Sequence, residues 1–157
     1  MLEVVNFSSI TNSDLDLVDR LAILRLSELK ELGELNPQKL DFYKRQILES
    51  IEEGYDYVMA QIQNNTPLGY CMGETQERQN YRIYRTAGLY VRPQYRGEGI
   101  AKKLKEIQIQ RARELECEII ESSTSSDNQV AIHLLRKLGF EINSSQTHNG
   151  VVGIMRL

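Results

Sequence analysis

The sequence predicts a mixed α/β fold in a single domain of residues 1–157. Short runs rich in β-branched and aromatic residues alternate with longer segments in which apolar side chains recur at helical spacing. The chain of 157 residues has the length of one domain, and its hydrophobic content of 41% suffices for one core. No repeat, low-complexity tract or domain linker interrupts it. We therefore expect a β-sheet covered by helices.

The elements of the first part are expected in the order β-α-α-β-β-β. Asn36 before Pro37 is typical of a helix start, and Gly54 follows that helix as a left-handed C-cap would. The polar letters "QNNT" separate two strand-like runs, which indicates a hairpin. The expected elements are a strand at 2–7, a helix with Leu17, Leu21 and Leu24 on one face, a helix with Leu40, Tyr43, Ile47 and Ile51 on one face, and strands at 55–62, 67–74 and 81–91.

The elements of the second part are expected in the order α-β-α-β-β. Ser126 with Gln129 fits a capping box for the last helix, and Gly139 is placed to end that helix. The expected elements are a helix at about 99–115, a strand at 117–122, a helix with Ala131, Leu134, Leu135 and Leu138 on one face, and strands at 140–143 and 151–157. The whole order is β-α-α-β-β-β-α-β-α-β-β.

Charge and cysteine usage argue against several classes of protein. The net charge is −3 and both signs are spread along the chain, so we expect no basic face for nucleic acid. Cys71 and Cys117 belong to no CxxC motif or Cys/His cluster, so we expect no metal site and no disulfide. No apolar run is long enough for a signal peptide or a membrane span. We therefore expect a cytoplasmic protein with no membrane partner.

The stretch "RPQYRGEGIAKKL" places two glycines and several cations where a strand gives way to a helix. Gly97 and Gly99 would allow a sharp turn that exposes backbone N–H groups at the helix start, which favours an anion such as a phosphate. A tight corner without any ligand explains the glycines equally well. A dinucleotide fingerprint fails because Lys102 stands at the third glycine position, and no P-loop pattern is present. Spacing alone leaves the phosphate site and the bare corner open.

Two longer motifs resemble the GNAT superfamily of N-acetyltransferases. "LYVRPQYRGEGIAKKL" is similar to the family's acetyl-CoA signature Q/R-x-x-G-x-G/A, in register with Gln94 to Gly99 or with Arg96 to Ala101. "DNQVAIHLLRKLGF" is similar to its second hallmark, and the two lie at the family's usual separation. The resemblance implies the GNAT fold, a mixed and mostly antiparallel sheet of about seven strands covered by four helices. It also implies transfer of acetyl from acetyl-CoA to a primary amine by direct attack in a ternary complex.

The resemblance also implies which residues bind acetyl-CoA, the co-substrate. Backbone N–H groups of the glycine turn would wrap the diphosphate, with a lysine side chain near a phosphate. Main-chain groups at the end of the preceding strand would pair with the pantetheine arm, and the N–H near Val91 would stabilise the oxyanion. Asn128 matches the family residue that binds pantetheine, although an ordinary helix cap explains this Asn as well. The implied residues are Leu89, Tyr90, Val91, Arg96, Gly97, Glu98, Gly99, Ile100, Ala101, Lys102 and Asn128.

The family's usual acid and base are missing from this sequence. Leu135 stands where many members have the tyrosine that protonates the sulfur, and Ser123 stands at the usual fifth-strand carboxylate position. The run at 81–91 contains no carboxylate either. The phenols of Tyr84, Tyr90 and Tyr95 lie near the expected cleft, where packing is the simpler explanation for them. The catalytic residues therefore stay unknown at this stage.

The acceptor and the activity itself remain open in the sequence. Relatives build the acceptor pocket from the link between the first two helices and from a loop that matches residues 143–150. Glu28, Glu31 and Glu34 near that link could attract a cationic amine or form an ordinary solvated face. A small-molecule or peptide amine is the expected partner, and homodimers are common in the family. The alternative to an enzyme is a non-catalytic, regulatory acyl-CoA-binding module.

Overall fold

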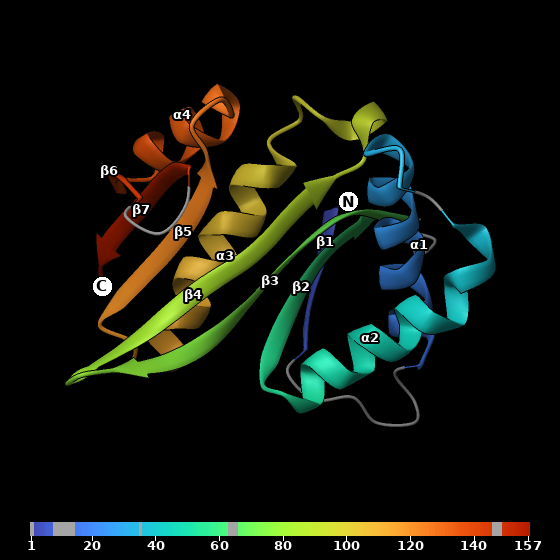
Figure 1. Ribbon diagram of the computed structural model, residues 1–157, viewed down its shortest axis with the longest axis horizontal. Helices are drawn as coiled ribbons and strands as arrows, with labels where there is room; N and C mark the ends of the chain where they lie inside the picture. Colours follow the sequence, from blue (N-terminus) through green and yellow to red (C-terminus); the bar gives the residue numbers. More distant parts are fainter. Residues whose placement is uncertain (1, 8–14, 35, 63–65, 146–148) are drawn as a thin grey trace. The chain divides into compact units, whose positions relative to one another are not determined.

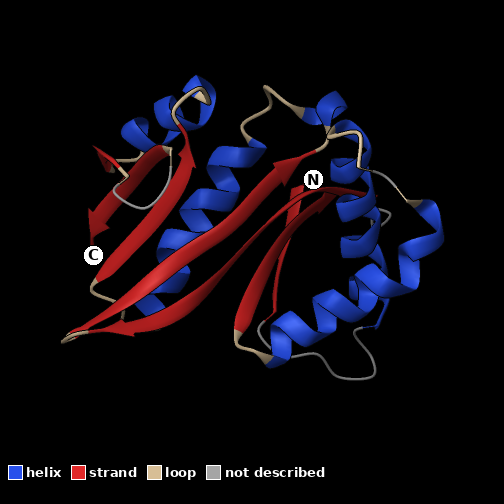
Figure 2. Ribbon diagram, viewed as in Figure 1, coloured by secondary structure: helices blue, strands red, loops and turns tan. Residues whose placement is uncertain are grey.

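The computed structural model describes the whole chain except residues 1, 8–14, 35, 63–65 and 146–148. Strands and helices follow each other in the predicted order, so the mixed α/β fold class is confirmed (Figures 1 and 2). The strands are β1 (Leu2–Phe7), β2 (Tyr55–Ile62), β3 (Thr66–Arg78), β4 (Tyr81–Val91), β5 (Ile119–Ser125), β6 (Glu141–Ser144) and β7 (Gly150–Arg156). The α-helices are α1 (Leu15–Glu31), α2 (Leu40–Glu52), α3 (Ile100–Glu114) and α4 (Gln129–Lys137), and the 3₁₀ turns are η2 (Pro37–Lys39) and η3 (Pro93–Tyr95).

The sheet mixes parallel and antiparallel pairs, in the strand order β1-β2-β3-β4-β5-β7-β6. β1 pairs antiparallel with β2, and β7 pairs antiparallel with both β5 and β6. β4 and β5 are parallel, and their ladder runs only from the pair Ile83–Ile119 to the pair Thr86–Ser122. Both strands continue beyond the last of these pairs, because β4 ends at Val91 and β5 at Ser125.

The chain groups into two compact units, one of residues 1–72 and 88–104 and the other of residues 73–87 and 105–157. The first unit has a core between two helices and three strands. α1 buries one stripe of apolar side chains, as its helical spacing predicts, and α2 contributes a second stripe. These stripes pack on aromatic and sulfur-containing side chains of β2, β3 and β4. The buried members are Val18, Leu21, Ala22, Leu24, Ile47, Ile51, Tyr57, Met59, Tyr70 and Tyr90.

The ends of α2 follow from local sequence. The Asn36 side chain accepts a hydrogen bond of 3.2 Å from the N–H of Gln38, which caps the η2 turn ahead of the helix. Gly54 closes the helix in the left-handed region at φ +101°, as predicted. The glycine conformation sends the chain directly into β2.

The second unit has its own core around Tyr84, which is fully buried. The ring of Tyr84 lies so close to Gly73 that a Cβ there would stand 2.5 Å from it, so only glycine fits at that position of β3. The other buried members are Ile109, Ala112, Cys117, Ile120, Leu135 and Phe140. Gly139, at φ +94°, ends α4 as predicted.

Candidate functional site

The turn between β4 and α3 has the backbone conformation that the glycine spacing predicts. Gly97 and Gly99 adopt φ values of +84° and +81°, in the left-handed region that disfavours residues with a Cβ. A Cβ built at either glycine would meet no atom within 4 Å. The glycines are therefore required by the turn's backbone and not by crowding, and the space in front of them is open.

The backbone N–H groups of this turn are left free to bind an anion. Within the described residues, the amides of residues 97–101 donate to no carbonyl oxygen or side chain. The amide of Arg96, which was expected to join them, already donates to the carbonyl of Pro93 at 3.2 Å. Residues 97–99 are exposed, and the buried side chain of Ile100 anchors the first turn of α3. The free donors and the helix dipole together favour negative charge at this point.

The charges around the turn fit a polyanion. α3 has no acidic residue in its first turn, where acids ordinarily stabilise a helix. Lys102 and Lys103 occupy that turn and are exposed. Glu98 is exposed as well. Its carboxylate would repel a phosphate, so only its backbone N–H suits one. Cations beside a positive helix end are disfavoured by the helix dipole, and an anion bound there would interact favourably with both.

The side chain of Arg96 points away from this anion site and ties the turn to the end of α1. Its guanidinium forms two hydrogen bonds of 2.7 Å with the carboxylate of Glu31, and its Nε donates to the carbonyl of Val91 at 2.9 Å. The guanidinium also lies 5.8 Å from the ring centroid of Tyr90. The hydrogen bond from Arg96 lowers the pKa of the Glu31 carboxyl. Sequence reasoning missed this pair, because 65 residues separate its members.

Three tyrosines from neighbouring strands stand in a row beneath α1 and α2. The ring centroids of Tyr57 and Tyr70 are 6.3 Å apart, and those of Tyr70 and Tyr90 are 6.4 Å apart. β3 and β4 lie close together at Tyr90, since a Cβ built on Gly69 would stand 2.5 Å from the Tyr90 carbonyl oxygen. This close backbone approach fixes the end of β4, where Leu89 and Val91 flank Tyr90.

Two of the three phenols have hydrogen-bond partners. The Tyr70 hydroxyl donates a hydrogen bond of 2.7 Å to the carboxylate of Glu28, and the same carboxylate accepts a hydrogen bond of 2.6 Å from Arg25. The Tyr57 hydroxyl lies 2.8 Å from the Ser50 hydroxyl. Tyr90 is only 6% exposed, and although its hydroxyl makes no close hydrogen bond to the described residues, the Glu31 carboxylate lies near enough to raise its pKa, after burial as the larger cause. Of the acidic residues considered from sequence, Glu28 and Glu31 are therefore structured by partners, and neither is simply solvated.

In the second unit, Asn128 serves as the N-cap of α4. Its side-chain oxygen accepts a hydrogen bond of 3.1 Å from the N–H of Ala131. Asn128 is exposed. The predicted capping box is wrong: Asn128, and not Ser126, caps the helix, and Gln129 donates its side-chain amide to the carbonyl of Ser126 at 2.9 Å. The cap occupies the oxygen of Asn128, which leaves its NH₂ group as the donor for a ligand. Leu135 is 2% exposed and belongs to the core.

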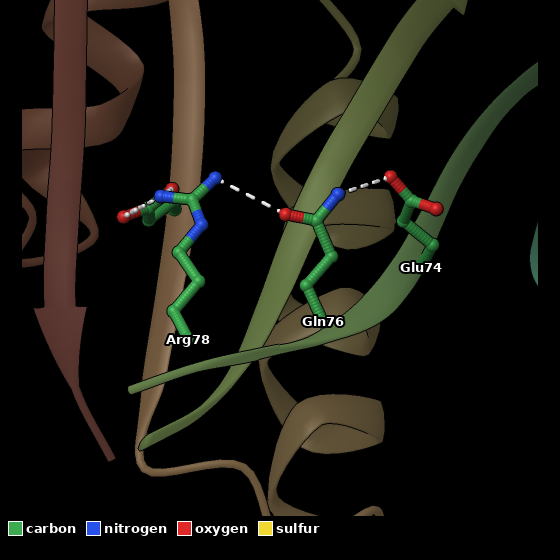
Figure 3. Close-up of polar contacts among 4 residues, drawn as sticks. Glu74, Gln76 and Arg78 are labelled. Carbon is green, nitrogen blue, oxygen red and sulfur yellow. Dashed lines mark hydrogen bonds and ion pairs between the residues drawn. The ribbon is translucent and has the colours of Figure 1, made fainter. Parts of the chain in front are cut away.

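A carboxylate that the sequence reading overlooked lies on β5. Glu121 precedes Ser123 by two residues, so strand alternation puts both side chains on the same face. Figure 3 shows three polar side chains of β3 joined by hydrogen bonds: Gln76 donates one of 2.6 Å to Glu74, and Arg78 donates one of 3.1 Å to Gln76. Arg78 also binds both carboxylate oxygens of Glu121, at 3.1 and 3.3 Å. The carboxylate is thereby held by a guanidinium on the third strand.

A buried lysine lies at the last pair of the β4–β5 ladder. The ammonium of Lys105, on α3, donates a hydrogen bond of 3.1 Å to the hydroxyl of Thr86 and one of 2.9 Å to the hydroxyl of Ser122. The Thr86 hydroxyl in turn donates a hydrogen bond of 2.9 Å to the Ser122 hydroxyl. All three residues are buried, so the hydroxyls replace part of the water that the ammonium loses. No sequence motif indicated this cluster.

The described ranges contain no candidate metal site and no candidate membrane-spanning helix. No group of three or more His, Cys, Asp or Glu side chains there is arranged to hold a metal ion. None of the helices described combines the length and apolar character that crossing a bilayer requires. Cys71 and Cys117 are buried free thiols.

Comparison with known proteins places these features in a family. A model of the acetyltransferase (GNAT) family matches residues 21–140. An L-methionine sulfoximine/L-methionine sulfone acetyltransferase of Pseudomonas paraeruginosa is 30% identical over 99 residues, which cover 62% of this chain and 58% of the relative. N-alpha-acetyltransferase 30 of Saccharomyces cerevisiae is 36% identical over 77 residues, 48% of this chain and 44% of that protein. A chain in the NatC complex bound to Gag peptide and CoA superposes with a TM-score of 0.67 at 23% identity, over 99% of both chains.

The chain belongs to the acetyltransferase (GNAT) family, because the family model matches most of its length. The solved structure, at its low identity, supports the fold and confirms the GNAT architecture. The segments aligned with the two curated relatives span between 44% and 58% of those proteins.

Proposed function

We propose that this protein is an acetyl-CoA-dependent N-acetyltransferase, with residues 1–157 forming one acetyltransferase domain. The observation that carries the proposal is the row of amides without a protein acceptor at residues 97–101, of which residues 97–99 are exposed, at the start of α3. Such donors suit a diphosphate, the group that coenzyme A would present there. The family membership supports the same cofactor.

The residues present fit coenzyme A at this turn. The open space in front of Gly97 and Gly99 admits phosphate oxygens close to the backbone, and Lys102 adds a cation beside them. Main-chain groups of Leu89 and Val91 would pair with the pantetheine arm as an added strand does. The family resemblance adds Asn128 of the second unit, whose NH₂ group is the donor that remains because its oxygen caps α4. Arg96 contributes by holding the turn through its bonds to Val91 and Glu31.

The chemistry that follows is direct acyl transfer. Bound acetyl-CoA supplies the activated acyl group, and the protein holds it beside an amine so that attack is no longer a bimolecular event. The N–H of Val91 would stabilise the negative charge that develops on the carbonyl oxygen. One proton leaves the amine and one is available to the departing thiolate, so the products are an amide and coenzyme A. No step requires Leu135 or Ser123.

The acceptor that we favour is an α-amine on an amino acid or peptide. The Pseudomonas relative is named for acetylation of methionine derivatives, and the yeast relative is named as an N-alpha-acetyltransferase. The two names share an amine on an α-carbon. We also expect a cytoplasmic location, which the free thiols of Cys71 and Cys117 support. A homodimer is expected as well, and light scattering would measure its mass.

A thiol-release assay tests the proposed function. Purified protein is incubated with acetyl-CoA and, separately, L-methionine, L-methionine sulfone, short peptides with a free α-amine, polyamines and aminoglycosides. Turnover with at least one amine is the expected result. Binding of acetyl-CoA without turnover of any amine would favour the non-catalytic acyl-CoA-binding module instead.

A further inference from the structure

We propose that Arg25 and Glu28 on α1 bind the acceptor as a zwitterion, so that the substrate is a free α-amino acid and not a peptide. The inference rests on the proposed function, because it narrows the class of amine assigned there. The guanidinium of Arg25 would hold the α-carboxylate, and the carboxylate of Glu28 would hold the α-ammonium. Both residues belong to the first unit, which also contains the turn of Gly97 and Gly99.

Glu28 uses only one of its two carboxylate oxygens in the part of the chain that the structure describes. The hydroxyl of Tyr70 and the guanidinium of Arg25 both donate to Oε2, at 2.7 and 2.6 Å. The other oxygen, Oε1, accepts no close hydrogen bond from the described residues. The side chain is 23% exposed, so a ligand can approach it from solvent. Glu28 can therefore bind an ammonium without giving up either of its partners.

Arg25 keeps N–H donors for a ligand. Burial tends to lower the pKa of its guanidinium, and the nearby Glu28 and Tyr70 raise it, so these two groups are its protein neighbours. A guanidinium has five N–H donors in a planar fork, and the close hydrogen bond to Glu28 occupies one of them. The side chain is 42% exposed. The remaining donors suit the two oxygens of a carboxylate.

Stability alone does not explain this ion pair. Partly exposed pairs at i, i+3 on a helix contribute little to the free energy of unfolding. The buried hydroxyl of Tyr70 needs only Oε2 of Glu28, and a glutamine at position 28 would accept the same hydrogen bond. Arg25 is not required for that bond. A cation and an anion held side by side, each open to solvent, are explained if they bind a ligand that carries both charges.

The pair lies near the strand end that is expected to hold the thioester. The ring centroid of Tyr70, which contacts Glu28, is 6.4 Å from that of Tyr90. Burial raises the pKa of Tyr90 most, and the carboxylates of Glu31 and Glu28 raise it further. Tyr90 directly precedes Val91, whose N–H is assigned to the oxyanion. An amine bound to Glu28 would therefore stand near the end of β4, where the acyl group is expected.

The two charges together favour a zwitterion over other amines. With an ammonium on Glu28 and a carboxylate on Arg25, each charge has neighbours of opposite sign. A polyamine or the α-amine of a peptide would bring a cation close to Arg25 without the compensating carboxylate. Repulsion between like charges is stronger in a partly buried site than in water. The Pseudomonas relative is named for derivatives of an amino acid, which agrees with this choice.

L-methionine sulfone and its amide, which lacks the carboxylate, test the proposal. We measure kcat/KM for both compounds with acetyl-CoA, together with the melting temperature of each variant. The wild-type protein should prefer the free acid by about tenfold or more. In Arg25→Gln the ratio of the two kcat/KM values should fall close to one, and Arg25→Lys should restore part of it. Glu28→Gln should lower kcat/KM for both compounds, because both carry the ammonium.

Arg20→Gln is the matched control, because Arg20 also forms an ion pair on α1, with Asp16. This variant should keep the wild-type ratio of free acid to amide. Equal kcat/KM values for the two compounds in the wild-type protein would overturn the proposal without any variant, as would an unchanged ratio in Arg25→Gln. A ratio lowered equally in Arg20→Gln would overturn it too, because the loss would then not be specific to position 25.

A binding measurement separates this proposal from the proposed function. Calorimetry follows the binding of L-methionine sulfone and of its amide to protein saturated with coenzyme A. If the free acid binds more tightly than the amide in the wild-type protein but not in Arg25→Gln, and no amine is acetylated, the zwitterion site stands and the proposed function fails. If the amide or a peptide is acetylated as well as the free acid, the proposed function stands and the zwitterion site fails. Neither preferential binding nor turnover would refute both.

Discussion

Replacing Gly97 with alanine, beside the same replacement at Gly54, separates the backbone cost of the turn from its use as a binding site. Both glycines have a left-handed φ, +84° and +101°, and a Cβ at either would meet no atom within 4 Å. The expected destabilisation is therefore the cost of that backbone region for a residue with a Cβ, about 1–2 kcal/mol in each variant. For a chain of this length, the melting temperature should fall by about 2–8 °C in both.

Affinity for acetyl-CoA should distinguish the two variants. In Gly97→Ala, the left-handed φ of +84° is strained for a residue with a Cβ, and the new methyl group enters the open space expected for the diphosphate. Losing one hydrogen bond to a charged group costs about 1.5–3 kcal/mol, which raises Kd about 10- to 150-fold. Gly54→Ala lies at the end of α2 and should bind as the wild-type protein does. Calorimetric titration with acetyl-CoA, together with thermal denaturation, measures both effects. Equal affinity in the two variants would refute the reasoning, whether both bind normally or both bind weakly.

Three further substitutions test other contacts. In Glu31→Gln, the carboxylate whose pKa is lowered by Arg96 is lost. Its contribution to the free energy of unfolding is present above the ordinary carboxyl pKa and fades as pH falls through the lowered pKa. Urea denaturation from about pH 7 to about pH 3 should therefore show the wild-type advantage shrinking in acid, and a constant difference would contradict the ion pair. In Thr86→Val, the Lys105 ammonium loses one hydroxyl acceptor, and the free energy of unfolding should fall by about 1–3 kcal/mol in chemical denaturation; no loss would argue against the buried cluster. In Gly69→Ala, the Cβ would stand 2.5 Å from a carbonyl oxygen of β4, so we expect at least about 2 kcal/mol of destabilisation, and a neutral result would contradict the close strand approach.

The order of helices and strands could be predicted because it depends on local periodicity. Helical spacing of apolar residues identified α1 and α2, and the glycines at 54 and 139 marked helix ends through the left-handed conformation that they adopt. Boundaries were less accurate. β3 continues to Arg78 instead of ending at 74, and α4 is capped by Asn128 because a single Asn can outcompete a capping box two residues earlier.

The candidate site was predictable only where it is local in sequence. The turn of Gly97 and Gly99 could be read from its spacing, since its conformation and free amides arise within one short segment. The pair of Arg96 with Glu31 and the row of tyrosines could not, because strand pairing and helix docking bring them together from distant parts of the chain. Glu121 could not be recognised from sequence because Arg78, which holds its carboxylate, lies 43 residues away in the chain.

The most direct test of the cofactor site is an amide NMR titration of ¹⁵N-labelled protein with acetyl-CoA. The amides of residues 97–101 donate to no protein acceptor in the structure, and Gly97 and Gly99 form the centre of the turn. We expect these resonances to shift in proportion to saturation, while the resonance of Gly54 stays in place. Binding of acetyl-CoA that leaves Gly97 and Gly99 unmoved would contradict the assignment of this turn to the diphosphate.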